Sequence, residues 1–283
     1  MKKLNLFLII SLIAFSGCQQ NITIQLPNYT PKVAVDCILQ DGTLPQLYLN
    51  LSTSYYSYGD TTNGYKSIKN AQVYITDQTA NTTDSLVLDS FKYRGNSWQY
   101  IYSSKPTGRN TTQAGHHYVL KINYNGRFIT AETTVPEPVK VDHFDYSLVN
   151  DPNNPPPYHN FNIYFYDLPG QGNYYSVTQI DSTGTSEYSD TDYISDLGFD
   201  GKLLEITTTD YDEQGNVEPP PYTHGFRINN ASKELGKYIT DINNQAFNSG
   251  PLNEPVTIES NINGGLGIFG AYTPSPIIYI HVK

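Results

Sequence analysis

The sequence is poor in residue types on which several functional classes depend. It contains 2 cysteines, 1 methionine, 1 tryptophan and 17 basic residues, and its 27 acidic residues leave a net charge of -10. A surface short of Lys and Arg repels phosphate backbones, so we expect no nucleic-acid partner. The 283 residues are enough for one large or two medium domains, each able to bury a core without disulfide or metal support.

No apolar run in the sequence is long enough to cross a bilayer as a helix, which takes about 20 residues. After two lysines, residues 4–15 form a shorter run that is typical of a secretory signal peptide. The next segment, Phe15-Ser16-Gly17-Cys18, resembles the lipobox of bacterial lipoproteins, although its first position usually holds Leu. In those proteins the cysteine begins the mature chain and carries acyl groups. We therefore predict a signal peptide at 1–17 and a palmitate-type anchor on Cys18 in outer-membrane lipid; an ordinary signal peptide with a chance cysteine is the alternative.

The segment that follows the anchor is predicted to be a tether. Residues 18–31 contain Asn, Gln, Thr and two prolines and show no periodicity, as expected of a linker between a membrane and a folded body. Lipoproteins that are exported to the cell surface often carry acidic residues directly after the cysteine, whereas Gln19-Gln20-Asn21 stand here. The sequence therefore leaves open whether the protein faces the surface or the periplasm.

Tyrosine is abundant, with 25 residues, and an alternation with period two begins near residue 32. Val33, Val35 and Cys37 share one face of a strand, which predicts a buried thiol. Asn125-Gly126 has the form of a two-residue hairpin turn. About seven short strands without a helical stretch predict an immunoglobulin-like or transthyretin-like β-sandwich over residues 32–136.

A proline-rich segment then interrupts the alternation. Two prolines in Val135-Pro-Glu-Pro-Val139 cannot both take part in a central strand, so we place a domain boundary there. Alternation resumes afterwards, for example at Phe161, Ile163 and Phe165. We predict a second, mostly antiparallel β domain over residues 137–283.

One part of this second domain has a different period. Leu235, Tyr238 and Ile239 follow the spacing of one helix face. The pattern predicts a helix near residues 231–245, with Ser232 or the nearby Asn230 as its N-cap. The overall prediction is a mainly β chain with a single helix.

Motifs of catalysis and cofactor binding fail in their context. Gly265, Gly267 and Gly270 match the glycine spacing of dinucleotide-binding turns, but the prolines that follow cannot begin the helix that would hold a pyrophosphate. The six histidines include no i, i+4 pair, and the second cysteine of a Cys/His zinc site is missing. We predict that the protein is not an enzyme and holds no cofactor and no metal.

Two acidic segments offer alternatives to this prediction. Asp210–Gly215 resembles the start of a calcium loop, but Pro221 stands where the bidentate Glu is needed. A second acidic cluster includes Asp196 and Asp200, which are candidates for adventitious cation binding or for hydrolysis of envelope glycans by paired acids. We expect solvated loop carboxylates in both segments.

A cluster of tyrosines is the strongest candidate for a binding surface. The segment 52–66 is too polar and rich in glycine to be core, and exposed tyrosines form contact surfaces at low entropic cost. The predicted binding loop for a peptide or glycan contains Tyr55, Tyr56, Tyr58 and Tyr65.

Several motifs together resemble a known family. They are the lipobox at Cys18, Val33–Ile38, Asn70–Val73, Gly172–Tyr175, Ser195–Gly201, the segment around Tyr238 and the tail Ser260–Tyr272. They are similar to Bacteroidota lipoproteins that carry a domain of unknown function in the four-thousand series and are often encoded beside TonB-dependent receptors. The resemblance implies a non-enzymatic accessory or binding subunit of a TonB-dependent outer-membrane transporter in nutrient uptake. A structural or adhesive surface lipoprotein is the alternative.

The tail is the most specific of these motifs. We predict that its residues either contact the partner or hold the tail in place. They are Asn261, Asn263, Gly265, Gly267, Phe269 and Tyr272.

Overall fold

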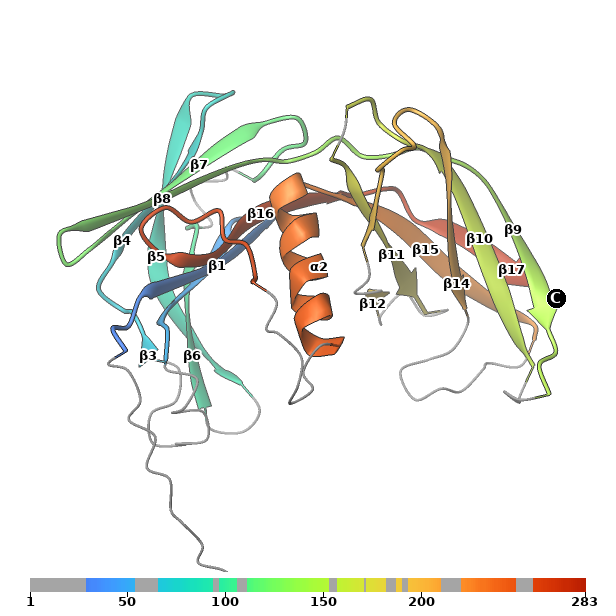
Figure 1. Cartoon of the computed structure of the whole chain (residues 1–283), viewed down its shortest axis with the longest axis horizontal. Coiled ribbons are helices and arrows are strands. Elements are labelled where there is room, and N and C mark those ends of the chain that lie inside the picture. The colour runs from blue at the N-terminus through green and yellow to red at the C-terminus, as the bar shows by residue number, and fades with distance from the viewer. Residues whose placement is uncertain are drawn as a thin grey trace, which may run out of the picture. The chain divides into compact units, whose positions relative to one another are not determined.

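The computed structural model divides the chain into Met1–Thr30 and a compact unit, Pro31–Lys283. It describes residues 29–53, 66–93, 97–105, 111–152, 157–170, 172–181, 187–189, 193–209, 220–247 and 257–283. Figure 1 shows the elements in chain order. They are β1 Val33–Gln40, β2 Gln46–Leu51, β3 Lys66–Ser67, β4 Gln72–Asp77, β5 Thr82–Tyr93, β6 Ser97–Ser103, β7 His117–Tyr124, β8 Arg127–Thr134, β9 Val141–Val149, β10 Tyr158–Tyr166, β11 Tyr174–Ile180, β12 Glu187–Ser189, β13 Ile194–Ser195, β14 Leu203–Thr209, β15 Tyr222–Ala231, α2 Lys233–Phe247, β16 Leu266–Pro274 and β17 Ile278–Val282.

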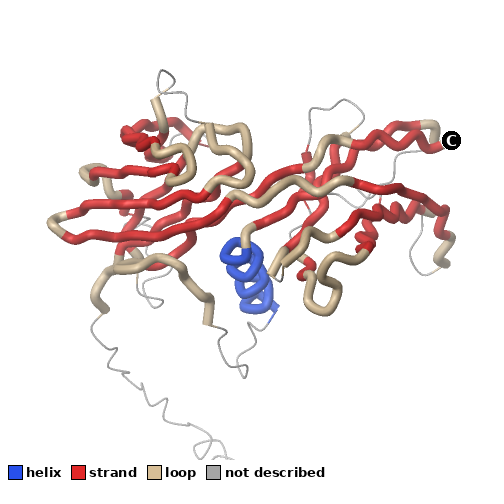
Figure 2. The backbone as a smooth tube through the Cα atoms, turned by 90° about the horizontal axis from the view of Figure 1, so that it is seen from above, coloured by secondary structure: helices blue, strands red, loops and turns tan. Residues whose placement is uncertain are grey.

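The predicted fold class is confirmed, because the described chain is mainly β, with one helix and a sandwich-like arrangement. A 14-stranded sheet follows the order β12-β11-β15-β16-β1-β2-β6-β5-β4-β7-β8, with β13, β17 and β3 pairing off this path with β11, β15 and β2. A 3-stranded sheet follows the order β14-β10-β9. Figure 2 shows the strands and the helix from a second direction.

Strands β1–β8 enclose the first hydrophobic core, and we call them the first module. Leu39, Leu47 and Leu120 are fully buried there. Cys37 is 1% exposed, which confirms the predicted buried thiol, and burial raises the pKa of this group. A buried, protonated thiol is a packing residue and not a nucleophile.

Strands β9–β15 and β17 form the second module. The sheet β14-β10-β9 packs over β11, β15 and β17 around a second core. Phe161 of β10 contacts Phe226 of β15 at 4.8 Å between ring centroids, and Phe165 meets Tyr175 at the same distance. The apolar faces predicted from the alternation of period two are therefore the facing layers of a sandwich.

Strand β16 joins the two modules. It pairs in parallel with β1, with Val35 opposite Gly267, and in an antiparallel sense with β15, with Asn230 opposite Thr273. Phe269 of this strand lies in the core of the first module. Apart from residues of the C-terminal tail, the residues of the first core come before residues 136–138 in the sequence, and those of the second core come after them. The predicted boundary at 136/137 stays a prediction.

The predicted helix corresponds to α2. Ser232 is its N-cap, because its Oγ accepts a hydrogen bond from the Leu235 amide at 3.4 Å. Leu235 is buried, and Tyr238 and Ile239 pack beside it on the sheet. No helix in the described part of the chain is both long and apolar enough to cross a membrane.

Candidate functional site

The structure describes only some of the residues that the sequence singled out. Cys18 and the binding-loop residues Tyr55, Tyr56, Tyr58 and Tyr65 lie outside the described residues, so their predicted roles stay predictions. The tail lies within them and has well-defined contacts. We therefore build the candidate site from the tail.

Asn261 ties two strands, β8 and β16, together. Its Oδ1 accepts a hydrogen bond from the Phe269 amide at 3.0 Å, and its Nδ2 donates to the Phe269 carbonyl at 2.7 Å and to the Glu132 carbonyl at 3.3 Å. The side chain thus imitates a strand backbone between β16 and β8. Both polar atoms of the side chain are used in these contacts, so a structural role within the fold explains the presence of Asn261.

Two glycines of the tail allow a close approach of β16 to β1. Gly267 has a φ of +104°, and a Cβ at this position would lie 1.9 Å from the Val35 carbonyl oxygen. A Cβ at Gly265 would lie 2.8 Å from the Val33 carbonyl oxygen. A side chain at either position would therefore disturb the parallel ladder.

The remaining tail residues are also engaged within the fold. The Asn263 amide donates to the Thr130 carbonyl at 2.8 Å, and the Thr130 amide donates to the Asn263 carbonyl at 3.1 Å. Phe269 is fully buried, and the Tyr272 hydroxyl donates to Gln40 Oε1 at 2.7 Å. Of the two roles predicted for the tail, the internal contacts support the structural one, and contact with a partner stays a prediction.

Two open hollows lie on either side of Asn261. One has a volume of about 350 Å³ and the other about 320 Å³. Their volumes are within the range of small-ligand sites, but both hollows are open and neither is lined by an aromatic side chain, unlike typical pockets. The first is lined by Lys233, Glu234, Lys237, Glu259, Ser260 and Asn261, and the second by Val119, Thr130, Ala131, Glu132, Asn261 and Asn263.

An ion pair crosses the first hollow. Lys237 Nζ lies 2.6 Å from Glu259 Oε2, and this hydrogen bond raises the pKa of the exposed lysine. The Glu259 amide in turn donates to Asp241 at 3.1 Å. The helical spacing of the sequence could not predict this pairing, since Glu259 lies in a segment separate from α2.

A second polar group lies at the end of the hairpin β4–β5. Asp77 lies 2.7 Å from His116 Nδ1 and accepts a hydrogen bond from the Ala80 amide at 2.9 Å. Although burial opposes its charge, the amide and the histidine hold the pKa of Asp77 below its usual value. Burial, with a further contribution from the Asp77 carboxylate, raises the pKa of Tyr118 to about 12.

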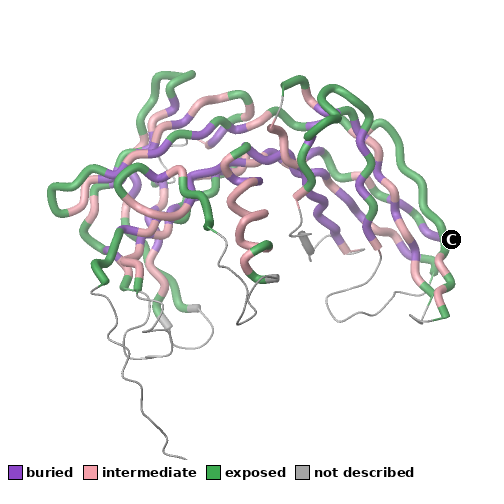
Figure 3. Tube along the Cα trace, in the orientation of Figure 1, coloured by how far each residue is buried: buried purple, intermediate pink, exposed green. Residues whose placement is uncertain are grey.

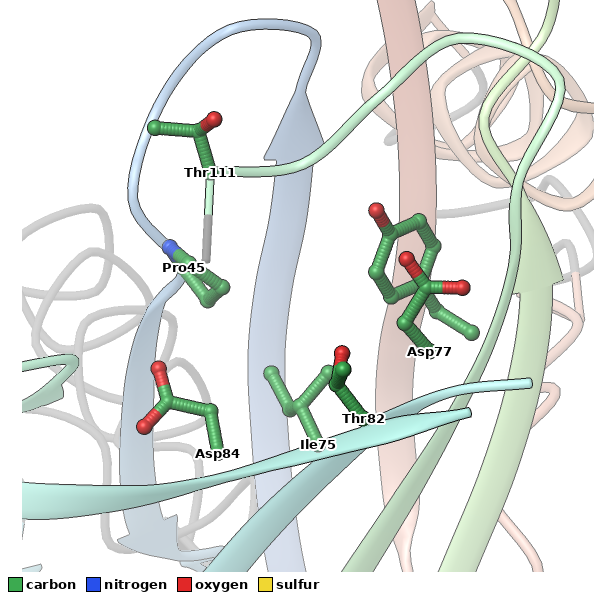
Figure 4. Close-up of a pocket in the computed structure, with 7 residues that line it drawn as sticks. Pro45, Ile75, Asp77, Thr82, Asp84 and Thr111 are labelled. Carbon is green, nitrogen blue, oxygen red and sulfur yellow. The ribbon is translucent and has the colours of Figure 1, made fainter. Parts of the chain in front are cut away.

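The cavity beside this group is too small for a ligand. Its volume is about 10 Å³, which is the space of one water molecule. Figure 4 shows side chains around it that include two carboxylates, those of Asp77 and Asp84. The lining residues are Pro45, Ile75, Asp77, Thr82, Asp84, Thr111 and Tyr118.

The acidic cluster of the second module holds its loops together. Asp196 is 2% exposed and accepts hydrogen bonds from the Gly172 amide at 3.0 and 3.1 Å. Asp200 accepts one from the Gly170 amide at 2.9 Å. No group of three or more potential metal ligands occurs among the described residues. Asp196 is therefore buried, and the expectation of a solvated loop carboxylate is wrong for it, whereas Asp200 is exposed. Both carboxylates stabilise turns, and the calcium-like segment at 210–215 lies outside the described residues.

Comparisons with known proteins give a family and two similar structures. A family model described as "Domain of unknown function (DUF4249)" matches residues 19–276. No curated protein matches the chain. A structure titled as a cytokine receptor complex in crystal form 1A shares 10% identity, with a TM-score of 0.24, over 87% of this chain and 95% of its own. A two-domain fibronectin type-III segment of chicken tenascin shares 12% identity, with a TM-score of 0.23, over 89% and 98%. At these TM-scores neither likeness bears on function.

Proposed function

The chain belongs to the DUF4249 family, and from this premise we propose that it is a non-enzymatic, lipid-anchored envelope protein that serves as an accessory or binding subunit of a TonB-dependent outer-membrane transporter. The family description assigns no activity, so the proposal depends on the chain's own residues and on the resemblance of its motifs to lipoproteins of the Bacteroidota. The ligand is a peptide or a glycan.

One observation carries the proposal, and it is the order of features before the β body. Two lysines, an apolar run, two small residues and Cys18 follow one another, and the compact unit begins at Pro31. Acyl chains on Cys18 would hold the molecule to a membrane without help from its acidic surface. A neighbour in that membrane is then its natural partner.

The test has two arms. The full chain and its Cys18→Ser variant are expressed in cells labelled with radioactive palmitate, and native membranes are then solubilised gently. We expect label only in the parent chain, together with co-purification of a TonB-dependent receptor. Equal membrane partition of both chains, or recovery of the parent as a lone monomer, would contradict the proposal.

A structural or adhesive surface protein is the second candidate, and one observation favours it. The cavity beside Asp77 has room for no more than about one water molecule, as expected of a rigid spacer. Replacement of Tyr55, Tyr56 and Tyr58 by Ala separates the two functions. A binding subunit would lose nutrient uptake, whereas an adhesive spacer would keep uptake and change its surface attachment.

A further inference from the structure

The second module ends in a strand with an unpaired edge. β9 pairs with β10 and terminates the three-stranded sheet, and no described strand pairs with its other side. Its 9 residues include no Pro and no Lys, the residue types that commonly block exposed edges. The register with β10 shifts once, at Asp142, and is regular from His143 to Val149. An edge of this length is a template on which another extended segment can add a strand.

The side chains beside this edge are apolar and only partly covered. Phe144, Tyr146 and Leu148 lie on the core side of the sheet, because their partners on β10 are buried. Yet they are 40%, 37% and 55% exposed. We call these three residues the β9 strip. Figure 3 shows exposed residues along most of β9. Along β10, by contrast, buried and part-buried residues alternate up to the exposed last residue.

The facing sheet ends too early to cover this strip. The Tyr146 hydroxyl donates to the His281 carbonyl of β17 at 3.4 Å, and no second described strand pairs with β17. β17 itself pairs with β15. The β9 strip therefore extends past the last strand that faces it, and an added strand would cover apolar surface as well as satisfy backbone groups.

The charge around the edge favours a basic occupant. Strands β9, β10 and β14 contain three carboxylates and no Lys or Arg. Two of them, Asp145 and Glu205, flank Tyr164, where burial and both charges raise the pKa of its hydroxyl. A second copy of this chain is a poorer occupant, because full-length antiparallel pairing of β9 with itself would set Asp145 opposite Asp145.

We propose that β9 is a docking edge for an extended segment of a partner protein in which apolar residues alternate with Lys or Arg. The segment adds a fourth strand to the sheet β14-β10-β9. Its apolar side chains cover the β9 strip, and its basic side chains lie beside Asp145. The inference goes beyond the proposed function, which does not specify the surface that a partner contacts.

The experiment uses the full chain in detergent and two peptides as long as β9. One alternates Val with Lys, and the other alternates Val with Glu. We expect the Lys peptide to bind, and hydrogen exchange to slow at the amides of β9. Leu148→Glu should weaken binding by at least about tenfold. The control Phe128→Glu, an equally apolar-to-acidic change at a 62% exposed position in the first module, should not. Asp145→Asn should reduce the preference for Lys over Glu, and it tests the proposal even where Leu148→Glu fails to fold.

Three results would overturn the proposal. The first is unchanged hydrogen exchange at β9 in the presence of the Lys peptide, and the second is an equal loss of peptide binding in Leu148→Glu and Phe128→Glu. The third is a dimer of the full chain that dissociates in the Leu148→Glu variant. Co-purification separates this inference from the proposed function. If Leu148→Glu retains the receptor, the docking edge is wrong and the proposed function stands; if the parent chain captures no receptor but binds the Lys peptide at β9, the reverse holds.

Discussion

The two modules have the same sandwich-like architecture but differ in how their sheets end. In the first, the outer strand β8 is met by the tail, through the backbone pair of Thr130 with Asn263 and the side chain of Asn261. In the second, the outer strand β9 pairs with β10 on one side and has no described partner strand on the other. The C-terminal tail thus covers the edge of β8 and leaves the edge of β9 free.

This difference indicates which surface is devoted to stability and which is available for contact. Backbone groups at a closed edge are satisfied within the chain, so closure contributes to folding. An open edge lowers stability and invites pairing, and natural chains usually block it. Retention at β9 of an edge with an exposed apolar strip is therefore the feature of the molecule that most needs a functional reason.

A substitution at Gly267, where β16 pairs with β1 of the first module, should cause the largest loss of stability. In Gly267→Ala the new Cβ would lie 1.9 Å from a backbone oxygen of β1, and this atom cannot move without opening the ladder. We expect a loss of about 4 kcal/mol in the free energy of unfolding, measured by urea denaturation. The control is Gly42→Ala, which has a φ of +75° but open space around its Cβ, and should cost only about 1 kcal/mol. Equal losses would show that backbone strain, and not the contact with β1, requires the glycine.

The attachment of α2 depends on a second missing side chain. In Gly236→Ala the Cβ would lie 2.0 Å from Tyr174 Cγ, near the rigid base of that side chain. Alanine favours a helix by about 1 kcal/mol over glycine, but we expect a net loss of about 2 kcal/mol from overpacking, measured by thermal unfolding. The double variant with Tyr174→Ala should recover part of the loss. A stabilised single variant would mean that the helix does not rest on Tyr174.

These two glycines also show how far local pattern can predict this fold. Alternation predicted the β class, and the spacing of Leu235, Tyr238 and Ile239 predicted the helix. Each of these patterns is formed by residues that lie close together in the sequence. From the sequence, Gly267 belonged to a glycine pattern that fails as a nucleotide motif, and Gly236 by itself would only weaken a helix. Glycine is needed at these positions because Gly236 lies against Tyr174 and Gly267 lies against β1. The spacing of residues in the sequence does not reveal which distant segments meet.

The candidate surfaces, too, were predictable only in their local sequence and not in their contacts with distant segments. The tail motif was recognisable as a local run of residues, and its neighbours in space were not. Alternation at Phe144, Tyr146 and Leu148 would predict a buried face, yet the structure leaves it partly open because the facing sheet ends at β17. Exposure of an apolar face is a property of the opposite layer, so the strand's own residues cannot disclose it.

Acid should weaken the hairpin β4–β5 of the closed module. The pKa of Asp77 is lowered in the folded chain, so its contribution to stability is complete above its unfolded pKa of about 4 and is lost as the pH falls through the folded value. Asp77→Asn should cost about 2 kcal/mol at neutral pH and flatten the acid limb of the unfolding free energy. The exposed Asp89→Asn variant is the control. An unchanged acid limb in Asp77→Asn would assign acid sensitivity to other carboxylates.

The finest comparison removes one tyrosine hydroxyl from each module. The Tyr102 hydroxyl is buried in the first module, where it donates to the Ile68 carbonyl at 3.0 Å and accepts from the Ala71 amide at 3.1 Å. Tyr102→Phe leaves both groups without that partner, and we expect a loss of about 1.5 kcal/mol. Tyr146 is 37% exposed, and its single bond to the β17 carbonyl measures 3.4 Å. Because water can replace this weak bond, Tyr146→Phe should change the free energy of unfolding by less than about 0.5 kcal/mol.

The same pair distinguishes stability from docking. If β9 is held by its contact with β17, Tyr146→Phe should destabilise the chain as much as Tyr102→Phe does, and urea denaturation of both variants would show it. If β9 is an edge that awaits a strand, the hydroxyl matters little for folding. The apolar ring of Tyr146 is then what the added segment covers, and Tyr146→Phe should bind the Lys peptide as well as the parent chain.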